Sequence, residues 1–241
     1  MTAEAQRLNR YLAACGLGSR RGVEVLVAEG RVAIDGVLAD SPGQRVEEGS
    51  VVTLDGAPVA PDAHAYILLN KPKDVVTTVR DTHGRRTVID LVGADLRLFP
   101  VGRLDAETTG LLLLTNDGEL AARLMHPRHG VEKTYEATVV GAVSEETARR
   151  LAEGVDLDGR RTAPARVRVL RASGRQSVVE IVLHEGRKRQ VRRMCEAVGH
   201  HVLGLHRSAY GGLRLGAMKA GASRPLLPAE VELLRSAAAN G

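Results

Sequence analysis

The spacing of apolar residues near the N-terminus predicts a small module of two helices and short strands. Apolar positions recur at helical spacing over residues 8–15, and a second helix is expected over residues 19–30, capped by its first residue, a serine. The dipeptides Asp35-Gly36 and Asp55-Gly56 are typical of tight hairpin turns between short strands. Two prolines then mark a linker. Residues 1–62 are therefore expected to form one domain.

The rest of the chain, residues 63–241, contains many short runs rich in β-branched residues. We expect strands at 65–69, 74–79, 111–115, 133–140, 165–170, 177–183 and 201–205, and helices at about 119–125, 144–153, 189–198 and 229–238. Strands grouped with occasional helices, without a regular strand–helix alternation, are typical of an α+β fold with a mainly antiparallel or mixed sheet. The second domain is expected to have this architecture.

Positive charge is concentrated in one segment of the chain. The net charge is +5, and residues 184–214 alone carry seven basic and two acidic side chains, whereas residues 1–62 carry six basic and nine acidic ones. Of the 34 cations 29 are arginine, which suits contacts with phosphate. A GC-rich genome would equally explain the arginine content, but not its clustering. Only five residues are aromatic, so stacking surfaces for bases are scarce.

Several classes of function are excluded because their motifs are missing. There is no phosphate-binding Walker loop, no dinucleotide fingerprint and no serine nucleophile elbow. His126 and His129 lack a third ligand nearby, and Pro127 breaks the helical face that would join them. The chain has no apolar run long enough to span a bilayer and no secretion signal at its start. We therefore expect a cytoplasmic protein without a metal, a nucleotide cofactor or a membrane partner.

One segment, residues 99–120, places a carboxylate beside a strongly apolar run. A loop with Arg103 and Asp105 leads into four consecutive leucines, which must be buried, and residues 116–118 are expected to end the strand as a tight turn. Such a carboxylate is either a structural cap or a positioned reactive group. Spacing alone favours the cap. The arginines nearby favour the reactive group, because a desolvated carboxylate stays ionised only when a cation or several donors hold it.

Residues 102–118, GRLDAETTGLLLLTNDG, resemble the signature of the pseudouridine synthases, in the branch that acts on ribosomal RNA and carries an N-terminal S4-like RNA-binding module. The blocks EKTYEA at 132–137 and HEGRKRQVRRMCEAVGH at 184–200 also resemble that family, and residues 7–36 resemble the S4-like module. The resemblance implies isomerisation of uridine to pseudouridine without a metal, nucleotide or redox cofactor. The target uridine would have to be flipped out or presented in an open loop.

The resemblance also implies roles for individual residues. Asp105 matches the catalytic aspartate, which attacks either the anomeric carbon or the base, or helps to expel uracil. Tyr135 would pack against the base and assist proton handling, and Val191 would press on it. Arg192 would pair with the catalytic carboxylate and keep it charged. Arg103 would bind RNA phosphate or brace the flipped nucleotide.

Other cations are candidates for contacts with RNA phosphate. Helical spacing puts Arg189, Arg192 and Arg193 within one turn, so that at least one can point inward. For Arg187, Lys188 and Arg193 the alternative is a solvated helix face. In the N-terminal module a local basic patch is expected, with a phosphate near the start of the second helix. Its members are Arg7, Arg10, Arg20, Arg21 and Arg31.

The expected substrate is ribosomal RNA or a pre-ribosomal particle, acted on by a monomer. The motifs at residues 117–127 and 185–200 resemble the branch of the family that acts on large-subunit (23S) rRNA more than the branch that acts on small-subunit (16S) rRNA. Two other functions are weighed against this one. A non-catalytic RNA-binding or ribosome-assembly protein would have no chemical reason to keep Asp105, Tyr135 and Arg192 together. A glycoside hydrolase would need a second carboxylate, for which Glu107 is the near candidate.

Overall fold

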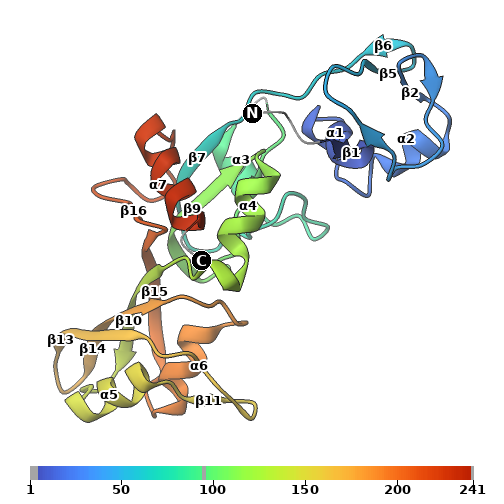
Figure 1. Ribbon diagram of the computed structural model, residues 1–241. Coiled ribbons are helices and arrows are strands. Elements are labelled where there is room, and N and C mark those ends of the chain that lie inside the picture. Colours follow the sequence, from blue (N-terminus) through green and yellow to red (C-terminus); the bar gives the residue numbers. More distant parts are fainter. Residues whose placement is uncertain (1–4, 94–95, 240–241) are drawn as a thin grey trace. The chain divides into compact units, whose positions relative to one another are not determined.

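Separate hydrophobic cores divide the chain into two units. The computed structural model describes residues 5–93 and 96–239. The first unit reaches to His64 and the second begins at Ala65, two residues beyond the expected boundary. One apolar cluster fills the first unit. Three clusters fill the second, which contains the large sheet (Figure 1).

The first unit consists of two short helices and two small sheets. Its elements are β1 (Gln6–Arg7), α1 (Leu8–Ala14), α2 (Glu24–Ala28), β2 (Val32–Ile34), β3 (Val37–Leu38), β4 (Arg45–Val46), β5 (Val52–Leu54) and β6 (Ala57–Pro58). The hairpins expected at Asp35-Gly36 and Asp55-Gly56 are confirmed. Both residues of each pair have positive φ, with 50° and 51° for the two aspartates, as a type I′ turn requires.

The second helix of this unit begins later than the sequence predicts. The Ser19 hydroxyl accepts a hydrogen bond from the Gly22 amide at 3.0 Å, which closes a turn and does not cap a helix. Helix α2 starts five residues further on and has only five residues, with Glu24 in its first turn. An acidic first turn on so short a helix does not make the phosphate site that we expected there.

The second unit is built on a nine-stranded mixed sheet. Its strands are β7 (Tyr66–Lys71), β8 (Phe99–Pro100), β9 (Thr108–Thr115), β10 (Lys133–Val140), β13 (Arg166–Ala172), β14 (Gln176–Leu183), β15 (Val202–Tyr210), β16 (Leu213–Arg214) and β17 (Ser223–Pro225). The order along the sheet is β13-β14-β10-β15-β9-β7-β17. Among these pairs β15 and β9 alone are parallel. The predicted α+β class with a mainly antiparallel sheet is confirmed.

Helices cover parts of both faces of this sheet. They are α3 (Val88–Val92), α4 (Gly118–Met125), α5 (Glu145–Glu153), α6 (Gln190–Ala197), α7 (Pro228–Ala239) and the 3₁₀ turn η1 (Pro127–His129); β11 (Asp156–Leu157) and β12 (Arg160–Arg161) form a separate hairpin. The four leucines of β9 are fully buried, as predicted. Leu111 and Leu113 pack with residues of α4 and α7, whereas Leu112 and Leu114 belong to the cluster that includes α3.

Two segments differ from the prediction. Residues 74–79 were expected to form a strand, but only an isolated bridge between Val76 and Thr87 forms there. Their backbone instead belongs to a loop that ends in the unpredicted helix α3.

Asp117 was expected only to end a strand, as part of a tight turn, but it also caps a helix. Its carboxylate accepts hydrogen bonds from the amides of Glu119 and Leu120, so it caps α4.

The parallel contact between β9 and β15 leaves no room for a side chain at Gly110. This residue has φ of +111°, and an added Cβ would lie 2.3 Å from the carbonyl oxygen of Arg207. We therefore expect Gly110→Ala to lower the free energy of unfolding by at least about 2 kcal/mol, through both backbone strain and the clash. Urea unfolding measures this change. Gly174→Ala is the control, because nothing lies within 4 Å of its Cβ position. Equal stability of the two variants would contradict the assigned constraint.

Candidate active site

Asp105 lies in the short loop that leads into β9, and its two neighbours are fixed by hydrogen bonds. The Thr77 hydroxyl donates to the carbonyl of Leu104 at 2.7 Å and accepts from its amide at 3.3 Å. The amide of Asp74 donates to the carbonyl of Ala106 at 2.9 Å. The backbone on both sides of the carboxylate is thus held, while the side chain itself takes no part in these bonds.

Lys71 provides the strongest anchor of this loop. It is the last residue of β7, its side chain is fully buried, and its Nζ donates to the carbonyls of Pro72, Ala106 and Thr108 at 2.9–3.1 Å. Burial lowers the pKa of Lys71 to about 8, opposed by the nearby carboxylates of Asp74 and Asp105. Three acceptors satisfy all three donors of an ammonium group, so the charge is accommodated without water.

Two arginines from the start of α6 face the carboxylates of this loop. Nη1 of Arg189 lies 3.8 Å from Oδ2 of Asp105 and 4.0 Å from Oε2 of Glu107. Nη2 of Arg192 lies 3.6 Å from the same Glu107 oxygen. The expected pairing of Arg192 with Asp105 therefore differs from the observed one, in which Arg189 is the partner of Asp105.

Backbone geometry explains this difference. Arg189 immediately precedes α6 and has a left-handed backbone conformation, with φ of 52°. Its side chain therefore does not follow the helical spacing that the sequence analysis assumed for Arg189, Arg192 and Arg193. Arg192 is buried, and its Nη1 donates to the carbonyl of Val202 at 3.2 Å, which directs the guanidinium along β15. Its Nε has no hydrogen-bond partner among the described residues. A strained arginine and an unsatisfied donor at one place are typical of a functional site.

The carboxylate of Asp105 is accessible in the free protein. Its side chain is 38% exposed, so the carboxylate is not desolvated before substrate binds. An ion pair of 3.8 Å at this exposure contributes at most about 1 kcal/mol to stability. A substrate can therefore displace Arg189 from Asp105 at low cost, and the substrate itself must exclude water.

Tyr135 and Val191 lie on the α6 side of the sheet. Tyr135 is partly buried and packs against two core clusters, one beneath α6 and one that contains Leu104, next to Asp105 in the chain. Val191 is only 3% exposed and belongs to the cluster beneath α6. A base stacked here would meet Tyr135 at the edge of the core, and Val191 through a small exposed surface.

The remaining cations of the α6 segment divide into two kinds. Arg187 donates to the carbonyls of Arg160 and Arg161, and Arg193 pairs with Asp158 at 2.6 Å. Their guanidinium groups therefore hold the β11–β12 hairpin, and neither is a free phosphate ligand. Lys188 is exposed, without such an ion pair in the described part of the chain.

In the first unit, Arg20 and Arg21 are exposed on the turn that precedes α2. Their contact with RNA stays a prediction, and the five-residue helix α2 begins only at Glu24. Arg31 is different. Its guanidinium forms ion pairs with Asp55 at 2.6 Å and with Glu29 at 3.2 Å, which neutralise its charge. The basic patch expected in this unit therefore loses the positive charge of Arg31.

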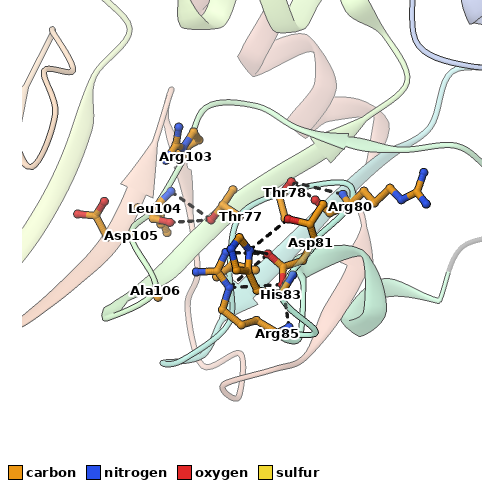
Figure 2. A pocket seen from close by; sticks show the side chains of 12 residues that line it. Thr77, Thr78, Arg80, Asp81, His83, Arg85, Arg103, Leu104, Asp105 and Ala106 are labelled. Carbon is orange, nitrogen blue, oxygen red and sulfur yellow. Dashed lines mark hydrogen bonds and ion pairs between the residues drawn. The ribbon is translucent and has the colours of Figure 1, made fainter. Parts of the chain in front are cut away.

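A cavity of about 560 Å³ adjoins Asp105 on the side of residues 76–85 (Figure 2). Its walls are the loop of residues 76–85 and the segment of residues 103–106, and Thr77 joins the two walls through its bonds to Leu104. Arg103 is exposed at the edge of the cavity.

The sequence analysis did not predict a role for Lys71 or Thr77. The one signal for Lys71 was its position as an ionisable residue at the end of an apolar strand.

No group of three or more potential metal-ligating side chains occurs within residues 5–93 and 96–239. Among the helices of the described chain, none is long and apolar enough to cross a membrane.

Comparison with known proteins identifies the family. The model of the RNA pseudouridylate synthase family matches residues 65–197, and that of the S4 domain matches residues 6–52. The chain is 41% identical to the ribosomal large subunit pseudouridine synthase B of Bacillus subtilis, over 98% of both chains. It is 43% identical to an uncharacterized RNA pseudouridine synthase of Aquifex aeolicus, over 95% of this chain and 93% of the other.

A solved structure supports the same assignment. A crystal structure of a pseudouridylate synthase superposes with a TM-score of 0.69 at 31% identity, covering 95% of this chain and 99% of that one. The chain therefore belongs to the RNA pseudouridylate synthase family and carries an S4 domain. It is an isomerase that acts on RNA, which confirms the class of enzyme that its sequence resembles.

The anchoring role of Lys71 can be tested with Lys71→Met, which keeps the length of the side chain and removes its charge. Three carbonyls lose their donor, and the bond to Thr108 is buried, so we expect the free energy of unfolding to fall by about 2–4 kcal/mol. The loop around Asp105 should also shift, and a displacement near 1 Å lowers the rate of conversion of bound RNA by about 10²-fold. Urea unfolding and single-turnover kinetics measure the two effects.

The pH dependence of stability gives a second readout for the same variant. Between the folded pKa of about 8 and the ordinary value of 10.5, the unfolded chain holds the Lys71 proton and the folded chain releases it. The stability of the wild type relative to Lys71→Met should therefore rise across this range, by up to about 3 kcal/mol. A difference that stays constant from pH 7 to 10.5 would show that Lys71 is not desolvated.

Proposed function

We propose that this enzyme converts uridine to pseudouridine in large-subunit (23S) ribosomal RNA, with Asp105 as the catalytic residue. The observation that carries the proposal is the geometry of the Asp105 loop. The backbone on both sides of the residue is fixed by Lys71 and Thr77, while the carboxylate faces Arg189 and remains accessible. The name of the Bacillus subtilis relative supports the choice of large-subunit rRNA.

Each residue then acts in a defined way. The carboxylate of Asp105 acts during cleavage of the bond between ribose and the uracil nitrogen. The base then rejoins the ribose through a ring carbon, which gives up its proton, while the freed ring nitrogen gains one. Attack on the anomeric carbon, attack on the base and assistance to the departing uracil all use the same carboxylate position. Tyr135 supports the detached base, and Arg189 and Arg192 stabilise negative charge that develops on it.

Water must also be kept away from the intermediate. The free carboxylate is exposed, so the flipped nucleotide itself closes the site against Tyr135. Flipping costs on the order of a few kcal/mol, which phosphate contacts from the S4 domain and from Lys188 offset. We propose that the enzyme works as a monomer in the cytoplasm on rRNA or a pre-ribosomal particle, without a metal or nucleotide cofactor.

Substitution of Asp105 tests the catalytic role. Asp105→Asn is nearly isosteric and removes the charge, so we expect the rate of pseudouridine formation on rRNA transcripts to fall by at least about 10³-fold, with folding and RNA affinity retained. Glu107→Gln is the matched control, because Glu107 shares the same arginines. It should keep the rate within about tenfold. Wild-type rates for Asp105→Asn would exclude this residue, and equal losses in both variants would indicate a pair of catalytic carboxylates.

The identity of the substrate is tested in cells that lack the gene. Pseudouridine mapping of their rRNA should show the loss of a modification from large-subunit rRNA, restored by the wild-type gene but not by Asp105→Asn. Loss from small-subunit (16S) rRNA would overturn the choice of substrate and leave the reaction intact. Unchanged maps for both rRNAs, together with retained RNA affinity, would favour a non-catalytic ribosome-assembly role.

A further inference from the structure

Glu185 and Gln190 form a hydrogen-bonded pair in the segment where β14 leads into α6, and the proposed reaction gives neither residue a role. Gln190 is only 4% exposed, and its Nε2 donates to Oε1 of Glu185. The same carboxylate oxygen accepts from the amide of Ala163 at 3.1 Å. The pair therefore ties the first turn of α6 to the segment that follows β12.

The carboxamide of Gln190 also closes a short turn that begins at Arg187. Its Oε1 accepts from the amide of Arg187 at 2.8 Å, and the amide of Gln190 donates in return to the carbonyl of Arg187 at 3.2 Å. Glu185 holds the turn from outside, since its Oε2 lies 3.3 Å from Nε of Arg187. Because these bonds join the first and last residues of the turn, the backbone of the two residues between them is restricted.

One of these two residues, Arg189, has a backbone conformation that arginine does not favour. Within residues 5–93 and 96–239, five residues other than glycine have a positive φ, and the other four are aspartates. Aspartate tolerates this conformation because its short side chain can bond to the local backbone, which arginine does not do. The left-handed conformation of Arg189 must therefore be imposed by the groups that close the turn.

The imposed conformation decides where the guanidinium of Arg189 lies. Its Nη1 is 3.8 Å from Oδ2 of Asp105 and 4.0 Å from Oε2 of Glu107. The carbonyl of Arg189 accepts from the amide of Arg193 at 3.0 Å, which attaches the residue to α6. Relaxation to the right-handed conformation would change both backbone dihedral angles and swing the guanidinium away from the two carboxylates.

We propose that Glu185 and Gln190 are positioning residues of the active site, which hold Arg189 in its left-handed conformation and thereby keep its guanidinium beside Asp105. The inference rests on the proposed function, in which Arg189 stabilises negative charge on the detached base. A donor that is held in place before the reaction needs no reorganisation during it. The pair acts through Arg189, so its loss lowers the rate of conversion of bound RNA and leaves RNA affinity intact.

A double-mutant cycle on the full-length enzyme tests this inference. Gln190→Leu removes both side-chain bonds and keeps the approximate size of the buried group. On an rRNA fragment that the wild type converts, it should lower the single-turnover rate by about ten- to a hundredfold and keep the Kd within about threefold. In the Arg189→Ala background the same substitution should change the rate by less than about twofold, because the residue that Gln190 positions is absent.

A second cycle with Glu185→Gln removes the carboxylate at a partly exposed position, where the fold tolerates the change. The rate should fall by about three- to tenfold, again only when Arg189 is present. Ser177→Ala is the matched control for lost stability. Its buried hydroxyl, at the opposite end of β14 from Glu185, accepts from the amide of Val143 and donates to the carbonyl of Gly141. This variant should unfold at lower urea concentration and keep the wild-type rate.

Three outcomes would count against the inference, and they are distinguishable. Wild-type rates for both Gln190→Leu and Glu185→Gln would show that the turn keeps its form without the pair. Equal losses with and without Arg189 would show that the pair only stabilises the fold. Both outcomes leave the proposed function intact, and if Gln190→Leu does not fold, the cycle with Glu185→Gln decides alone. If the wild type converts no rRNA at all, the proposed function fails, and with it the inference that rests on it.

Discussion

One buried ammonium group fixes the loop that carries Asp105, the carboxylate that we propose to be catalytic. Lys71 has no access to water, so its three donors must find acceptors in the protein, and they find them in the carbonyls of Pro72, Ala106 and Thr108. The chain on the C-terminal side of Asp105 is thereby tied to the end of β7. This constraint acts through the backbone alone. The carboxylate of Asp105 is left free of structural bonds and can take part in chemistry.

The single parallel strand pair of the sheet brings the arginines to this loop. Strand β15 runs beside the start of β9, where Gly110 permits close contact with Arg207. Helix α6 immediately precedes β15 in the chain and packs against it, so its first residues lie at the same end of β9 as Asp105. Arg189 and Arg192 reach the loop for this reason. The parallel pairing of β9 and β15 thus brings together segments of the site that lie about 85 residues apart in the chain.

Local patterns in the sequence correctly predicted the elements that depend on the residues of one short segment alone. The leucine run of β9, the strand at 133–140 and the Asp-Gly turns all form where alternation, apolar content and turn chemistry placed them. The segment of residues 74–79 was predicted wrongly, because β-branched residues favour extended backbone but do not supply a neighbouring strand. Its hydrogen bonds go to the Asp105 loop and to its own base.

The membership of the site stays a prediction, whereas the structure changes one of its pairings. Asp105, Tyr135 and Arg192 were chosen because the sequence resembles a known family, but the partner of Asp105 depends on the left-handed backbone of Arg189, which no local sequence pattern predicts. Tyr135 shows a further consequence. Because its ring joins two core clusters, its rotamer is fixed before RNA arrives, and truncation to alanine would loosen the core as well as the site. Removal of the hydroxyl alone, in Tyr135→Phe, separates proton handling from the stiffness of the ring.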